Sequence, residues 1–104
     1  MGNFVLVYVG GSQPASEEEG KAVMDAWMAW FGTLGDAVVD GGNPFGASAS
    51  IAPDGAVSEG SGSGATGYSV LRADDLAAAI VLAQGCPHLS AGGTVEVHEA
   101  HEVM

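Results

Sequence analysis

Positive charge is scarce in this sequence, which has one Lys (Lys21) and one Arg (Arg72) against 13 Asp and Glu, for a formal net charge of −11. Nucleic acids and anionic membranes are bound through clustered cations, so we expect the chain to bind neither. The single cysteine, Cys86, excludes a disulfide within the chain and is typical of a reducing compartment such as the cytoplasm. Long apolar runs are also missing, so we expect no signal peptide and no transmembrane span.

Glycine and apolar residues, in contrast, are plentiful. The chain has 104 residues, of which 17 are Gly and 47% are hydrophobic. That length is typical of one domain, and that apolar content argues against disorder. We therefore predict a single folded domain over residues 1–104, with the glycines concentrated in turns and in one loop.

Residues 4–9 read as a strand whose two faces are both apolar. Successive side chains alternate across a strand, so Phe4, Leu6 and Tyr8 would share one face and the valines between them the other. A strand with two apolar faces is typical of the centre of a sheet that is covered on both sides.

The remaining pattern predicts an α+β domain in the order β-α-β-β-α-β. We expect a helix from the cap Ser16 to Leu34, strands at 36–40 and 67–72, a helix from the cap Asp74 to the stop Gly85, and a strand at 94–97 that extends toward Val103. This order is the ferredoxin-like arrangement, with an antiparallel sheet and both helices on one sheet face. The other apolar face would then need a lid. A second copy is the simplest one, so we predict a homodimer.

Two Gly-rich segments lie between the second and third of these strands. Residues 47–52 are expected to continue the sheet as far as a turn at Pro53-Asp54-Gly55. Residues 59–66 are Gly and Ser-rich and read as a flexible loop. This loop lacks the Gly-Lys-Ser/Thr ending of a phosphate loop, and we predict no cofactor.

Three short stretches resemble the YCII-related family, including its DGPF branch. They are Gly67-Tyr68-Ser69-Val70-Leu71-Arg72-Ala73-Asp74, Cys86-Pro87-His88-Leu89 and Val95-Glu96-Val97-His98-Glu99. Together with residues 38–42 and the Trp-bearing first helix, the resemblance covers nearly the whole chain. It implies a ferredoxin-like homodimer, described as a dimeric α+β barrel, and it matches the element order predicted from the pattern.

The resemblance does not bring a catalytic pair with it. One branch of the family has a His on the first helix and an Asp in an Asp-Pro turn, proposed as an acid-base pair. Here Asp25 and Cys86 fall at those positions, so the pair is not carried over. The DGPF motif is also incomplete, because Asp54-Gly55-Ala56-Val57 keeps only the Asp-Gly. In the branch with a Pro-His-Leu turn, His88 is the matching position.

Cys86, His88 and Asp40 are the candidate catalytic residues. A thiol becomes a nucleophile when a neighbouring base or cation lowers its pKa, and His88 lies two residues from Cys86. The competing interpretations are a buried, inert Cys86 and a structural His88, since the C-terminus of a helix opposes thiolate formation. Asp40 could form a carboxylate pair with Asp36 on one strand face, or hydrogen-bond its own turn.

His98 and His101 invite a metal interpretation. A zinc pair on a helix needs spacing of four residues, whereas these two are three apart in a predicted strand and would face opposite sides. We predict no metal site. The candidate ligand-binding residues are instead the aromatic side chains Tyr8, Trp27 and Tyr68, together with His88.

Three functions stay open from the sequence. The first is a homodimer that binds an unidentified small molecule, held between sheet and helices or at the dimer seam. The second is an enzyme that uses Cys86 and His88 in an unspecified reaction. The third is a non-catalytic module for protein interaction, whose dimer surface is itself the function.

Overall fold

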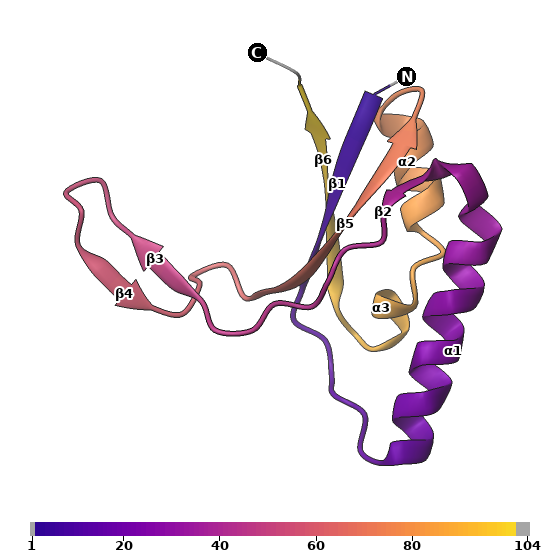
Figure 1. The fold of residues 1–104 in the computed structure, drawn as a ribbon, viewed down its shortest axis with the longest axis horizontal. Coiled ribbons are helices and arrows are strands. Elements are labelled where there is room, and N and C mark those ends of the chain that lie inside the picture. Colours follow the sequence, from indigo (N-terminus) through magenta and orange to yellow (C-terminus); the bar gives the residue numbers. More distant parts are fainter. Residues whose placement is uncertain (1, 102–104) are drawn as a thin grey trace.

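The computed structural model describes residues 2–101 and shows a mixed α+β fold with antiparallel sheets (Figure 1). The elements are β1 (Gly2–Val9), α1 (Glu17–Leu34), the 3-10 helix η1 (Gly35–Ala37), β2 (Val38–Asp40), β3 (Ala49–Ile51), β4 (Val57–Glu59), β5 (Ala65–Ala73), α2 (Leu76–Ala83), α3 (Pro87–Ser90) and β6 (Thr94–Ala100). The predicted continuation of the last strand toward Val103 lies partly outside the described residues.

β1 lies inside the main sheet, as its two apolar faces predict. The sheet has four strands in the order β2-β5-β1-β6, and β1 is antiparallel to both of its neighbours. Leu6 pairs with Ser69 of β5 on one side and with Val97 of β6 on the other. The predicted strands at 4–9, 67–72 and 94–97 are present, and of the strand predicted at 36–40 only residues 38–40 form β2, because residues 36 and 37 belong to the 3-10 helix η1.

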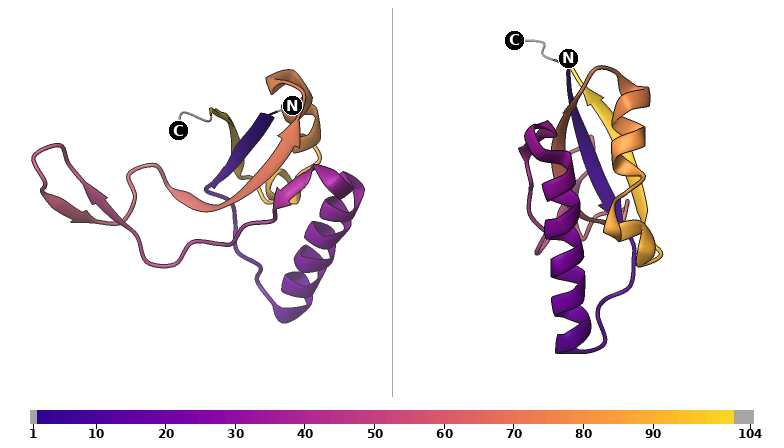
Figure 2. Two further views of the ribbon diagram at one scale, coloured as in Figure 1. Left: turned by 45° about the horizontal axis from the view of Figure 1, so that its top comes forward. Right: turned by 90° about the vertical axis from the view of Figure 1, so that its right-hand side faces the viewer.

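The helices cover one face of this sheet (Figure 2). Phe4, Leu6 and Tyr8 point to that face and are buried, with exposed fractions of 1%, 0% and 6%. Leu6 and Tyr8 pack in one cluster with Trp30 of α1 and Ala83 of α2. Alternation along β1 sends the valines at 5, 7 and 9 to the other face, where they stay half-buried. Within residues 2–101, no helix lies on that side of the sheet.

Helix α1 begins as predicted. Helical spacing places its large apolar side chains, Met24 and Met28 among them, on one wide arc, and the helix packs less deeply than that arc predicts. The Ser16 hydroxyl accepts a hydrogen bond from the Glu19 N–H at 3.1 Å, which satisfies one of the free amides of the first turn. Gly35 follows the last helical residue with a φ of 56°. Trp30 is the buried residue of the helix, whereas Met24 and Met28 are 62% and 68% exposed and contribute little to the core.

The predicted cap of the second helix was wrong by one residue. Asp75, rather than Asp74, is the N-cap of α2, and its carboxylate accepts from the Ala78 N–H at 2.9 Å. Only a residue with extended backbone immediately before the first helical turn can place its side chain on those amides, and Asp75 meets that condition. The helix then ends at Ala83, so Gly85 follows the turn instead of stopping it.

Residues 47–52 do not continue the main sheet, which corrects the prediction. β3 pairs only with β4, in a separate two-stranded sheet that projects as an arm away from the body (Figure 1). Pro44 makes a single bridge to Gly67 and has no N–H with which to extend a ladder. The turn at the tip forms as predicted, because the Asp54 carboxylate accepts from the Ala56 N–H at 2.9 Å.

Gly42 is the position where the chain most needs glycine. Its φ is +76°, and a Cβ there would overlap the carbonyl oxygen of Tyr68. We expect Gly42→Ala to lower the free energy of unfolding by about 2 kcal/mol or more, through backbone strain and separation of the turn from β5. Urea unfolding would measure this loss.

Gly46→Ala is the matched control, because an added Cβ at Gly46 meets no atom within 4 Å and the φ of Gly46 is not positive. A loss for Gly42→Ala no larger than that for Gly46→Ala would contradict the close approach described here.

Candidate functional site

A chain of buried hydroxyls runs through the core between β1 and β5. The Tyr8 hydroxyl donates to Ser69 Oγ at 2.7 Å, and Ser69 Oγ donates in turn to the Gly41 carbonyl at 2.7 Å. Ser69 is fully buried. A buried hydroxyl without a partner is costly, and this chain ends on a backbone carbonyl that satisfies it. It fixes the turn after β2 to the middle of the sheet, which is a structural role.

Cys86 lies beside the hydrogen-bonded hydroxyls of Tyr8 and Ser69 and is held as a neutral thiol. It is a free cysteine, 3% exposed, at the start of the four-residue helix α3. Burial raises the pKa of the Cys86 thiol from its usual 9.0 to about 11, and burial also raises the pKa of Tyr8. A nucleophilic cysteine needs the opposite shift. The geometry therefore favours the inert interpretation of Cys86.

His88 ties α3 to the end of β1. Its Nε2 lies 3.0 Å from the Val9 carbonyl oxygen, which can only accept, so Nε2 carries the proton and donates. The ring fits against two glycines, since a Cβ at Gly93 would overlap it and one at Gly11 would lie 2.7 Å from its Cε1. The half-buried His88 ring thus holds α3 against the end of β1 and the residues that follow it, which is a structural role.

Trp27 forms part of the wall of the core. Its ring centroid lies 5.0 Å from that of Tyr8 in an edge-to-face arrangement and 5.7 Å from that of Trp30. The predicted ligand residues Tyr8 and Trp27 therefore contact each other, and aromatic rings fill the space between sheet and α1. Three surface hollows of 330–370 Å³ lie elsewhere, and neither Cys86 nor His88 lines any of them.

Asp40 and Tyr68 lie on the uncovered side of the sheet. The Tyr68 hydroxyl points toward Asp40 Oδ2 at 3.5 Å, and Asp40 Oδ1 accepts from the Gly42 N–H at 2.8 Å. Phe45 stacks on Tyr68 with ring centroids 5.8 Å apart and an interplanar angle of 19°. Asp36 lies in η1, outside the strand, so the predicted Asp36–Asp40 pair on one strand face does not form.

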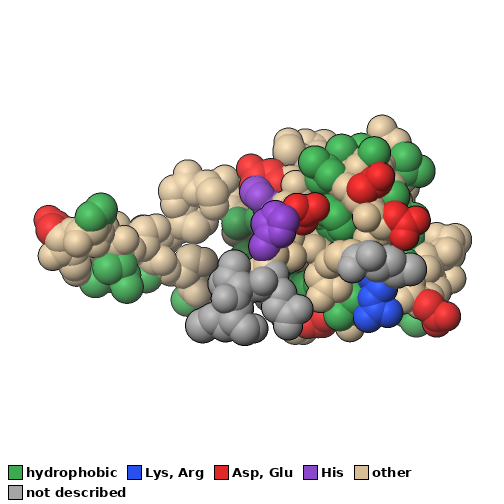
Figure 3. Space-filling model, turned by 90° about the horizontal axis from the view of Figure 1, so that it is seen from above, with side chains coloured by type: hydrophobic (Ala, Val, Ile, Leu, Met, Phe, Trp, Pro, Cys, Tyr) green, Lys and Arg blue, Asp and Glu red, His purple; other side chains and the backbone are tan. Residues whose placement is uncertain are grey.

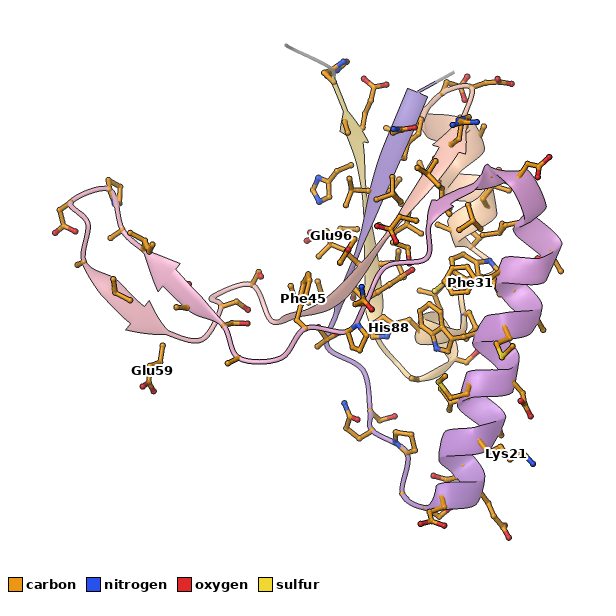
Figure 4. All side chains as sticks on the ribbon, in the orientation of Figure 1. Lys21, Phe31, Phe45, Glu59, His88 and Glu96 are labelled. Atoms are coloured by element: carbon orange, nitrogen blue, oxygen red, sulfur yellow. The ribbon has the colours of Figure 1, made fainter. Side chains whose placement is uncertain are left out.

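The sheet thus separates the candidate residues into two groups. Tyr8, Trp27, Cys86 and His88 lie on the helix side, and Asp40 and Tyr68 on the other. In Figure 4, His88 lies on the same side of the sheet as Phe31 of α1, whereas Phe45 and Glu96 lie toward the arm. Sequence reasoning missed Phe45, because a ring in an irregular segment carries no periodic signal that would place it.

The histidines of β6 and its end form local pairs. His98 Nε2 lies 3.1 Å from a Glu96 carboxylate oxygen, and His101 Nε2 lies 2.7 Å from Glu99. Each pair is substantially exposed. From residue 2 to residue 101, no three His, Cys, Asp or Glu side chains gather closely enough to hold a metal ion.

Comparison with protein-family models and with curated protein sequences finds no match for this chain. The described part of the chain also contains no helix with the length and apolar character needed to cross a membrane.

The buried thiol predicts a pH dependence of stability. Between pH 9.0 and about 11 the unfolded chain loses the Cys86 proton while the folded chain keeps it, so the free energy of unfolding should fall as the pH rises through this window. Urea titrations at several alkaline pH values would measure the fall.

Cys86→Ala removes the thiol, so its free energy of unfolding should fall less steeply over the same window. Tyr8 contributes a fall of the same sign in both proteins, because its pKa is also raised in the fold. Equal slopes for the two proteins would show that Cys86 titrates normally in the folded state.

Proposed function

We propose that this protein is a homodimer that binds a small molecule at the seam between its two copies. The observation that carries the proposal is the uncovered face of the main sheet. Val5 and Val7 of β1 and Val70 of β5 meet there across paired strands, and all three are half-buried with no helix over them. A sheet that is apolar on both faces is normally covered on both.

The charges of the chain support a second copy as the cover. β1 and β5 contain no Asp or Glu, although the chain carries 13 of them. Alternation places Arg72 on the uncovered face, and the two acids on that side lie on the edge strands: Glu96 of β6, 3.1 Å from His98, and Asp40 of β2. Two copies of an acidic protein repel each other least through an acid-poor surface.

The strand order supports the ferredoxin-like and YCII-related assignment, which we include in the proposal. Without the β3–β4 arm and the short helices η1 and α3, the elements follow the order β-α-β-β-α-β, and the sheet reads β6-β1-β5-β2 across its width. The helices lie on one face. Two such sheets packed through their uncovered faces would form the dimeric α+β barrel that the resemblance implies.

The seam is a better place for a ligand than the space between sheet and helices. Tyr8, Trp27 and Trp30 fill that space under α1 with contacting rings, and the open hollow between α2 and β6 is lined mainly by apolar side chains, without Tyr8, Trp27, Cys86 or His88. The uncovered face instead combines an apolar floor with polar groups at its margin, among them Tyr68 and Asp40. This combination is typical of small-molecule sites. The neutral, buried thiol of Cys86 gives the enzyme alternative no support.

The dimer can be tested by light scattering. We expect the protein to have twice the chain mass at micromolar concentration, and Val7→Glu to weaken association at least tenfold, or about 1.4 kcal/mol. A carboxylate at residue 7 would be buried without a partner in the seam.

Val81→Glu is the matched control, because Val81 lies on α2 and is 67% exposed. The Val81→Glu protein should therefore keep the mass of the dimer. Far-UV circular dichroism would check that both variants fold. A folded wild-type monomer at micromolar concentration would rule the dimer out.

The ligand site can be tested by a thermal-shift screen against metabolites. A ligand at a free concentration of 100 times its Kd stabilises the folded state by about 2.7 kcal/mol, which measurably raises the midpoint temperature of thermal unfolding. We expect a hit to be lost in Tyr68→Ala and kept in Cys86→Ala, since these residues lie on opposite sides of the sheet.

A hit that is kept in Tyr68→Ala and lost in Cys86→Ala would place the ligand site on the helix side of the sheet. No hit for a dimeric protein would favour the third function, an interaction module without a ligand.

A further inference from the structure

We propose that the β3–β4 hairpin is an arm that clasps the second copy of this chain. The inference rests on the proposed homodimer and adds a second contact surface to it. The arm stands away from the body of the protein, and its strands pair only with each other (Figure 1).

The hairpin has one apolar and one polar face. Ile51 pairs with Val57 on one face, where Ala49 and Glu59 form the pair at the base, and Ser50 pairs with Ser58 on the other face. Ile51 and Val57 are 73% and 68% exposed, and apolar side chains are visible on the surface of the arm in Figure 3. A two-faced hairpin of this kind normally rests its apolar face on another surface.

The hairpin is also too small to be stable alone. Its ladder consists of three residue pairs. Isolated two-stranded hairpins are marginal in water and become stable when a further strand or a packed surface covers their apolar face. The tip adds an Asp54 turn but no apolar packing. The stabilising surface must therefore come from outside the hairpin.

The position of the arm identifies the second copy as that surface. Figures 1 and 2 show the arm on the side of the main sheet opposite the helices, which is the side of the uncovered face. Phe45, in the segment that leads into the arm, stacks on Tyr68 of that face. A copy that sits on the uncovered face is therefore beside the arm.

The arm is long enough to reach a facing sheet. Facing sheets pack about 10 Å apart, and the three residues of β3, at a rise of ~3.3 Å each, span about the same distance. The acids of the hairpin, Asp54 at the tip and Glu59 at the base, leave its middle uncharged. Glu59 shares the face of Ile51 and Val57 but lies at the base of the arm, so the apolar pair nearer the tip would meet the second copy with that carboxylate at the edge of the contact.

The test is the double variant Ile51→Thr, Val57→Thr. Threonine keeps the branched Cβ that favours strands, so the hairpin can still form while its apolar face becomes polar. Sedimentation velocity over a dilution series would give the dimer Kd. We expect the double variant to raise it roughly tenfold or more through lost apolar burial. Ser58→Asn, on the polar face, is the control and should leave the Kd within about twofold.

Hydrogen exchange of residues 49–59 gives a second readout on the wild-type protein. We expect their amides to be protected at concentrations well above the dimer Kd and to lose that protection on dilution below it. A wild-type dimer whose Kd is unchanged by the double variant, and whose arm exchanges equally at both concentrations, would overturn the arm and leave the homodimer standing. A wild-type monomer would overturn both.

Discussion

The structure depends on the alternation of apolar side chains along β1. Phe4, Leu6 and Tyr8 anchor the sheet to the helices, and nearly all of their surface is buried. The valines between them have no such cover within residues 2–101. Because side chains alternate with a period of two, the chain cannot bury the first set without presenting the second set on the opposite face. The helices thus cover one side of the domain, and the valines on the other side stay half-buried.

The same alternation decides which candidate residues can act together. Tyr8 and Ser69 meet on the helix side, where the Tyr8 hydroxyl donates to Ser69 and the Ser69 hydroxyl donates to the Gly41 carbonyl. His88 holds the end of β1, and Cys86 stays protonated in the core. Each of these groups has a structural partner. On the other side, Asp40 accepts from the Gly42 N–H through Oδ1, and its Oδ2 lies 3.5 Å from the Tyr68 hydroxyl.

Local signals predicted most of the elements, and long-range geometry accounts for the errors. The Ser16 cap, the Gly35 stop and the Asp54 turn act within a few residues, and sequence reasoning placed all three. The separation of residues 47–52 from the main sheet was missed, because it depends on how the Gly42 turn passes Tyr68, a contact between residues far apart in the chain. Met24 and Met28 were assigned to an apolar arc, but spacing alone does not say how much of that arc meets the sheet.

The division of apolar residues in the described chain leaves much apolar surface open on a single copy. Nine hydrophobic side chains are buried, whereas eleven large ones are exposed, including Ile51 and Val57 on the arm. A domain of this size buries a limited share of its surface, so its stability is small and any further burial matters. Contacts made only between folded copies stabilise the fold by mass action. The uncovered sheet face and the arm would then serve folding and assembly at once, and the strength of the dimer would set how much of the protein is folded when it is dilute.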